Sequence, residues 1–122
     1  IVEDNHINQV VLKTMLQRLN LETYTADHGA KALALLNQLQ GEGNGIDLIL
    51  MDCQMPIMDG FDATRHIRSS NEPYANIPII AVTANALSSD KERCLQCGMN
   101  DYLSKPFQLD DIRGKLQDWL TN

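Results

Sequence analysis

Short apolar runs alternate with longer amphipathic stretches along the whole chain. The apolar runs predict five strands, bounded by polar or turn-forming residues, over residues 1–2, 22–26, 47–51, 78–82 and 101–104. Between them, apolar residues recur every three or four positions. This spacing predicts five helices, over residues 5–19, 30–40, 61–69, 88–97 and 109–120. The alternation is typical of a doubly wound α/β domain, a parallel sheet covered by helices on both faces.

The first predicted helix can be capped by Asn5 or Asn8, because either side chain can accept the first unpaired backbone N–H groups. Its apolar positions define the face that we expect to pack on the sheet. This face contains Ile7, Val10, Val11, Thr14, Met15 and Leu19. Later in the chain, Gly98 is placed to end the fourth helix after Cys97.

Length and charge narrow the class of protein. The 122 residues suit one domain spanning 1–122, and the net charge of −6 argues against nucleic-acid binding and against contact with an anionic membrane. No apolar stretch approaches the roughly 18 residues of a membrane span. Three cysteines, an odd number, favour a reducing, cytoplasmic location over a disulfide framework. Because the first strand holds only two residues, we expect a domain cut from a longer protein, with the start of that strand missing.

Polar residues of particular kinds follow four of the predicted strands. Glu3 and Asp4 follow the first, Asp52 the third, Thr83 the fourth and Lys105 the fifth. Right-handed crossovers bring the carboxyl ends of parallel strands to one edge, where ligands bind in such sheets. We therefore expect three carboxylates, a hydroxyl and an ammonium group to lie close together.

This set of groups suits a divalent cation and a phosphoryl group. Three carboxylates repel one another, and Mg²⁺ relieves the repulsion because it prefers oxygen ligands and often shares its coordination sphere with phosphate. A carboxylate beside such an ion can attack phosphorus and form an aspartyl-phosphate. Asp52 is the best candidate nucleophile, since it ends the most hydrophobic strand.

Four sequence blocks together resemble the signature of the response-regulator receiver domain, over essentially the whole chain. The blocks are Val2-Glu3-Asp4-Asn5, Met51-Asp52-Cys53-Gln54-Met55-Pro56-Ile57-Met58-Asp59-Gly60, Val82-Thr83-Ala84-Asn85-Ala86 and Ser104-Lys105-Pro106-Phe107. The resemblance implies a flavodoxin-like, CheY-like fold with strand order 2-1-3-4-5 and five helices. It also implies a phosphoacceptor switch of two-component or phosphorelay signal transduction.

The resemblance assigns a role to each site residue. Asp52 would be the phosphoacceptor, and it would bind Mg²⁺ together with the Asp4 side chain. Gln54 would contribute its backbone carbonyl to the ion, and Glu3 would act through a water molecule.

Three further residues would respond to the phosphoryl group. Thr83 would hydrogen-bond it, and Lys105 would pair with it. Tyr102 would be the switch aromatic that moves inward when Thr83 moves to the phosphate. The change would reach the surface formed by the fourth helix, fifth strand and fifth helix.

The run from Asn5 to Gln9 and the Met-Pro-x-Met-Asp-Gly loop resemble receivers fused to hybrid sensor histidine kinases. The implied partner is therefore a histidine kinase or a histidine phosphotransfer domain, and the parent protein could be anchored in the inner membrane. The domain itself would show at most slow self-dephosphorylation, which leaves its status as an enzyme open. A separate response regulator is the alternative parent.

Other interpretations of the same residues need features that the sequence lacks. An aspartyl-nucleophile phosphatase of the haloacid dehalogenase type carries a second Asp where this chain has Gln54. A flavodoxin-like flavin module needs a hydroxyl-rich phosphate loop where this chain has Glu3, Asp4 and Asn5. Cys94 and Cys97 lie at a helix end and Cys53 follows a buried strand, so we interpret all three as structural thiols.

Overall fold

The computed structural model describes residues 1–43, 45–53, 59–70, 72–83, 88–104 and 108–120. Three strands form its regular sheet: β1 (Ile49–Asp52), β2 (Ile79–Thr83) and β3 (Asp101–Ser104). The helices are α1 (His6–Arg18), α2 (Gly29–Gly41), α3 (Gly60–Ser69), α4 (Ser88–Cys97) and α5 (Leu109–Leu120), with a short 3₁₀ helix, η1, at Pro73–Asn76. The fold is the predicted α/β arrangement.

The sheet is parallel, in the order β1-β2-β3. Two further segments extend it through single bridges, because Val2 pairs with both Met51 and Ala26. Reading across the sheet, the segments at Ala26 and Val2 precede β1, β2 and β3, which gives the expected order 2-1-3-4-5. The regular strands predicted at 1–2 and 22–26 are, however, single bridges. Three backbone hydrogen bonds join residues 1–3 to residues 24–26, too few for a continued ladder.

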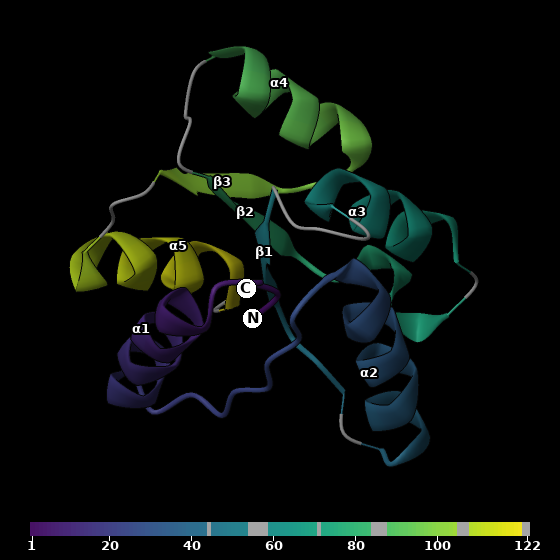
Figure 1. Cartoon of the computed structure of the whole chain (residues 1–122), viewed down its shortest axis with the longest axis horizontal. Coiled ribbons are helices and arrows are strands. Elements are labelled where there is room, and N and C mark those ends of the chain that lie inside the picture. The colour runs from purple at the N-terminus through teal and green to yellow at the C-terminus, as the bar shows by residue number, and fades with distance from the viewer. Residues whose placement is uncertain (44, 54–58, 71, 84–87, 105–107, 121–122) are drawn as a thin grey trace.

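Helices cover both faces of the sheet (Figure 1), α1 and α5 on one face and α2, α3 and α4 on the other. Alternate residues of each central strand point to opposite faces. Ile49, Met51 and Ile79 join the α2–α3–α4 core, whereas Leu50 and Ile80 join the α1–α5 core. All residues of β1 and β2 are buried, as expected for strands enclosed on both faces.

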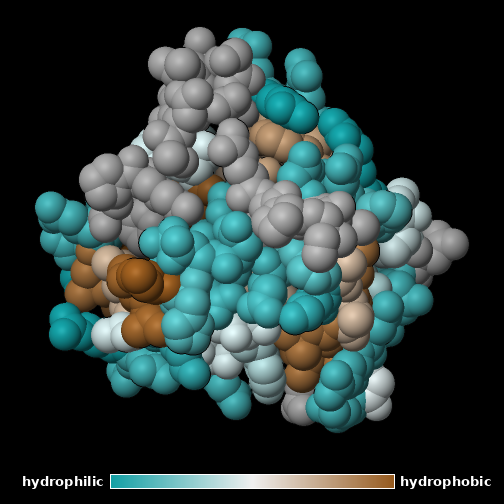
Figure 2. Space-filling model, in the orientation of Figure 1, coloured by the Kyte–Doolittle hydropathy of each residue, from teal (hydrophilic) through white to brown (hydrophobic). Residues whose placement is uncertain are grey.

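The predicted inner face of α1 was wrong in its first two turns. Asn5 caps the helix, and this start directs Gln9, Leu12 and Leu16 toward the sheet. Ile7, Val10 and Val11 instead lie outside, 72%, 50% and 44% exposed; we call these three residues the α1 patch. Figure 2 shows hydrophobic surface on the side where Figure 1 places α1. Of the other predicted positions, Met15 and Leu19 do pack on the core and Thr14 is exposed.

Two glycines fix helix ends at opposite edges of the sheet. Gly98 follows α4 with φ of +111°, a conformation that other residues rarely adopt, and it confirms the predicted end of that helix. Gly60 opens α3 against the end of β1, where a Cβ atom would collide with the backbone oxygen of Asp52. The close approach holds the start of α3 beside the strand that carries Asp52. In the described ranges, no helix is long and apolar enough to cross a bilayer.

Candidate metal centre

Three carboxylates meet at the carboxyl edge of the sheet, and we call Glu3, Asp4 and Asp52 the acidic pocket. One carboxylate oxygen from each lies within 4.8 Å of the others. The bridge between Val2 and Met51 brings them together, since the backbone N–H of Asp52 donates to the Val2 carbonyl at 2.9 Å. Glu3 and Asp52 are buried, at 1% and 7% exposure, whereas Asp4 is exposed. The sequence-based prediction that these residues converge is confirmed.

The start of α1 holds Glu3 in place. Glu3 Oε1 accepts hydrogen bonds from the Asn5 backbone N–H at 3.3 Å and from Asn8 Nδ2 at 3.2 Å. The buried Gln9 side chain donates to the Glu3 carbonyl and, at 2.9 Å, to Asp27 Oδ1. Asn8 and Gln9 were not among the predicted site residues, although both lie in the run that resembles hybrid-kinase receivers.

The acidic pocket fits a divalent cation. Its three carboxylates carry a formal charge of −3, two of them in a buried setting where an uncompensated charge is costly. All three offer hard oxygen ligands, the donor set that Mg²⁺ prefers, and the exposed Asp4 leaves the cluster open to solvent on one side. The donor set and burial therefore match the predicted Mg²⁺ site.

Thr83 ends β2 at the same edge of the sheet. Asp52 pairs with Val82 in the register between β1 and β2, so Thr83 lies one residue beyond the partner of Asp52. Thr83 is 7% exposed, and in the next register it pairs with Ser104 of β3. Two predicted site residues, Gln54 and Lys105, lie outside the described residues.

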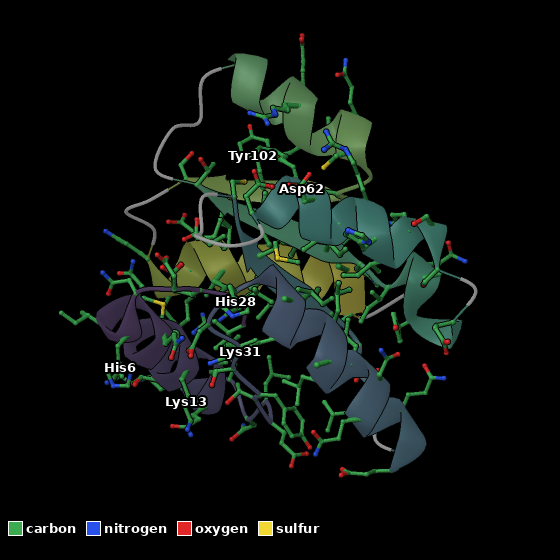
Figure 3. All side chains as sticks on the ribbon, turned by 45° about the vertical axis from the view of Figure 1, so that its right-hand side comes forward. His6, Lys13, His28, Lys31, Asp62 and Tyr102 are labelled. Atoms are coloured by element: carbon green, nitrogen blue, oxygen red, sulfur yellow. The ribbon has the colours of Figure 1, made fainter. Side chains whose placement is uncertain are left out.

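Tyr102, the predicted switch aromatic, lies on β3 and packs partly buried against the core that includes α4 residues (Figure 3). The Lys115 ammonium from α5 lies 5.5 Å from the centre of its ring. Lys115 also pairs with Asp101 Oδ1 at 2.9 Å, and Trp119 Nε1 donates to Asp101 Oδ2 at 3.1 Å. Burial by itself would raise the pKa of Asp101, but the hydrogen bonds from Trp119 and Lys115 outweigh burial and lower it.

The three cysteines are buried and reduced, as predicted for structural thiols. Cys53 follows β1, and its Sγ lies 3.6 Å from Sγ of Cys94 on α4. Burial raises the pKa of the Cys53 and Cys97 thiols, so the reactive thiolate form is disfavoured at neutral pH. Cys53 therefore acts as a packing residue beside Asp52.

Comparison with known proteins identifies the class. The response regulator receiver domain matches residues 1–117. The chain is 41% identical over 115 residues to hybrid signal transduction histidine kinase L of Dictyostelium discoideum, covering 93% of this chain and 7% of that protein. It is also 41% identical over 116 residues to the sensor histidine kinase RcsC of Escherichia coli K12, covering 95% and 11%. The chain thus belongs to the response regulator receiver domain family, and it spans only about a tenth or less of these relatives.

Solved structures agree with this assignment. The receiver domain of a sensor histidine kinase from Pseudomonas aeruginosa, which has a magnesium ion in its active-site cleft, is 44% identical with a TM-score of 0.87 and covers 99% of this chain and 94% of that one. A Saccharomyces cerevisiae histidine phosphotransfer protein was solved with the receiver domain of its downstream response regulator. That match has a TM-score of 0.81, 33% identity and coverage of 97% and 84%. The resemblance inferred from four sequence blocks is confirmed, which disfavours the phosphatase and flavin alternatives.

Proposed function

We propose that Asp52 accepts a phosphoryl group from a phosphohistidine and that Glu3 and Asp4 bind the required Mg²⁺ with it. The observation that carries this proposal is the acidic pocket itself, three carboxylates within 4.8 Å beside Thr83 in a receiver-family chain. Carboxylates gathered in this way repel one another, and a bound cation offsets the repulsion. One of the carboxylates can then react with a phosphorylated donor.

The transfer itself is a displacement at phosphorus. An Asp52 carboxylate oxygen forms the new P–O bond as the P–N bond to the donor imidazole breaks, and the electron pair returns to the imidazole nitrogen, which takes up a proton. Mg²⁺, when bound, offsets negative charge on the phosphoryl oxygens. The backbone carbonyl of Gln54 is assigned to the same ion, and Lys105 to the phosphoryl group.

Asp52 labelling tests the proposal directly. With acetyl phosphate and Mg²⁺, the protein should gain one hydroxylamine-sensitive phosphoryl group, measured by intact mass. Asp52→Asn should gain none, because the nucleophile is lost. Asp110→Asn is the matched control, since Asp110 is an exposed residue that pairs with Arg113 on α5. Equal labelling of Asp52→Asn and the control would refute the assignment.

Thr83 and Tyr102 form the proposed relay to the surface. Thr83 is the last residue of β2, which lies beside the strand that carries Asp52. Tyr102 on β3 pairs with Ala81, two residues before Thr83 on β2. Thr83 and Tyr102 therefore lie close together on adjacent strands. Thr83→Ala should still accept a phosphoryl group but lose the phosphorylation-dependent change in the Tyr102 ring resonances. An unaltered change in that variant would show that the hydroxyl is not the relay.

We propose that a histidine phosphotransfer domain docks on the α1 patch. The patch is apolar and exposed, and α1 begins two residues after Asp4, so a partner seated there lies near the acidic pocket. Val10→Lys should slow transfer from a phosphorylated phosphotransfer domain and leave labelling by acetyl phosphate unchanged. Leu95→Lys, at an exposed apolar position on α4, is the control. Equal transfer rates in the two variants would rule out this surface.

The parent polypeptide is proposed to be a hybrid sensor histidine kinase rather than a separate response regulator. The curated relatives at 41% identity carry histidine kinase or hybrid signal transduction names and are far longer than this chain. A cytoplasmic position for the receiver, with any membrane anchor elsewhere in the parent, follows from this proposal. The flanking sequence tests it, since a kinase core upstream would agree and a DNA-binding module downstream would contradict it.

A further inference from the structure

Amide side chains connect the start of α1 to the acidic pocket. Asn8 donates to Glu3 Oε1 at 3.2 Å, and Gln9 donates both to the Glu3 backbone carbonyl and to Asp27 Oδ1. Gln9 is 9% exposed and takes a place on the inner face of α1 that Leu12 and Leu16 share. A buried amide at a core position is costly unless its hydrogen bonds are made. Here the Gln9 amide bonds to Glu3, a member of the acidic pocket, and to Asp27.

We propose that Asn8 and Gln9 are positioning residues, which hold Glu3 in the orientation that a divalent cation requires. The inference rests on the metal site proposed above and extends it to α1. Glutamate has three rotatable side-chain torsions, and an unrestrained Glu3 would lose that freedom on binding an ion. The hydrogen bonds to its backbone and its carboxylate set the orientation in advance.

The chemistry of these donors matters as much as their position. Asn8 and Gln9 are neutral, so they orient Glu3 without neutralising its charge, and the charge stays available to a cation. Lys31, at the start of α2 (Figure 3), is directed to another carboxylate and pairs with Asp27 Oδ2 at 2.8 Å. Gln9 links two acidic residues, because its amide donates to the carboxylate of Asp27 and to the backbone carbonyl of Glu3. A lysine at position 8 would satisfy Glu3 equally well but would compete with the metal.

Mg²⁺ titration calorimetry on the unphosphorylated chain tests the inference without any transfer reaction. Asn8→Ala should bind Mg²⁺ about tenfold more weakly, a loss typical of outer-shell partners of metal ligands. Alanine favours helix, so the loss cannot come from unfolding of α1. Gln9→Met, which keeps the volume of the side chain, should also weaken binding. Gln17→Ala, which removes an exposed amide on the same helix, should bind Mg²⁺ with the affinity of the unsubstituted chain.

A double-mutant cycle separates positioning from a general effect on the fold. If Asn8 acts through Glu3, Asn8→Ala should have no effect on Mg²⁺ affinity in a Glu3→Gln background. Unchanged affinity of Asn8→Ala, or an equal loss in both backgrounds, would overturn the inference. In those cases loss of labelling in Asp52→Asn would still support Asp52 as the phosphoacceptor. If the unsubstituted chain failed to bind Mg²⁺, both the proposed metal site and the positioning role of Asn8 and Gln9 would be overturned.

Discussion

Two regions of the molecule hold buried or half-buried carboxylates, and they are built in opposite ways. At the start of β3, Asp101 is surrounded by groups that favour its charge: the Lys115 ammonium, the Trp119 indole N–H and the Tyr102 backbone N–H. In the acidic pocket, three carboxylates lie together, and the hydrogen bonds that α1 supplies to Glu3 come from uncharged groups.

The difference separates a stabilising carboxylate from a reactive site. Asp101 joins β3 to α5 and lowers the free energy of the folded state. The acidic pocket brings three like charges together, two of them buried, and their mutual repulsion opposes folding until a cation binds. At the carboxyl edge of the sheet, the residues that can bind a metal are therefore a source of repulsion in the absence of the metal.

Mg²⁺ should produce the largest contrast between the two regions. At a concentration one hundred times its Kd, an ion that binds only the folded state adds about 2.7 kcal/mol, roughly 10 °C in melting temperature for a domain of this size. Asp4→Asn should reduce this gain, because one ligand of the pocket is lost. Asp101→Asn should keep the full gain. Equal gains in the two variants, measured by differential scanning calorimetry, would count against a cation shared by the pocket.

Without Mg²⁺, the two substitutions should change stability in opposite directions. Asp4→Asn should raise the free energy of unfolding by about 1 kcal/mol, since it relieves repulsion in the pocket. Asp101→Asn should lower it by about 1 kcal/mol, because Lys115 loses its charged partner in a half-buried setting. Urea denaturation at low ionic strength measures both effects. A destabilised Asp4→Asn variant would mean that the pocket is not strained by its charge.

Acid should remove the contribution of Asp101, the smallest of the three effects. The pKa of Asp101 in the folded state lies below its ordinary value of 3.8, so its contribution is complete above 3.8 and is lost as pH falls through the folded pKa. The difference in unfolding free energy between the parent chain and Asp101→Asn should therefore stay constant near neutral pH and shrink below 3.8. If the difference in unfolding free energy instead grew as pH fell, the pKa of Asp101 would not be lowered in the folded state.

Much of the fold and site could be predicted because each signal is local and strong. Buried parallel strands appear as continuous apolar runs, and the residues that follow them must meet at one edge, which is how Glu3, Asp4, Asp52 and Thr83 were found. The end of α4 was equally clear, because Gly98 has the backbone conformation that ends helices in this way.

The errors concern choices that local pattern leaves open. In α1, the apolar residues Val10 and Val11 suggested the inner face, but the structure places Gln9 there, because its amide finds partners on Glu3 and Asp27. Hydrophobicity cannot reveal that a buried amide will be satisfied by residues from other segments. The role of Asn8 was missed for the same reason.

The contact between Trp119 and Asp101 gives this domain an optical reporter. The chain has one tryptophan, and its indole N–H is bonded to the carboxylate that also holds Lys115, whose ammonium lies near the Tyr102 ring. Emission from that single fluorophore therefore comes from the β3–α5 surface, without a contribution from any other indole in the chain. Movement of Tyr102, on the last strand of the sheet, could be followed in real time in the unlabelled protein.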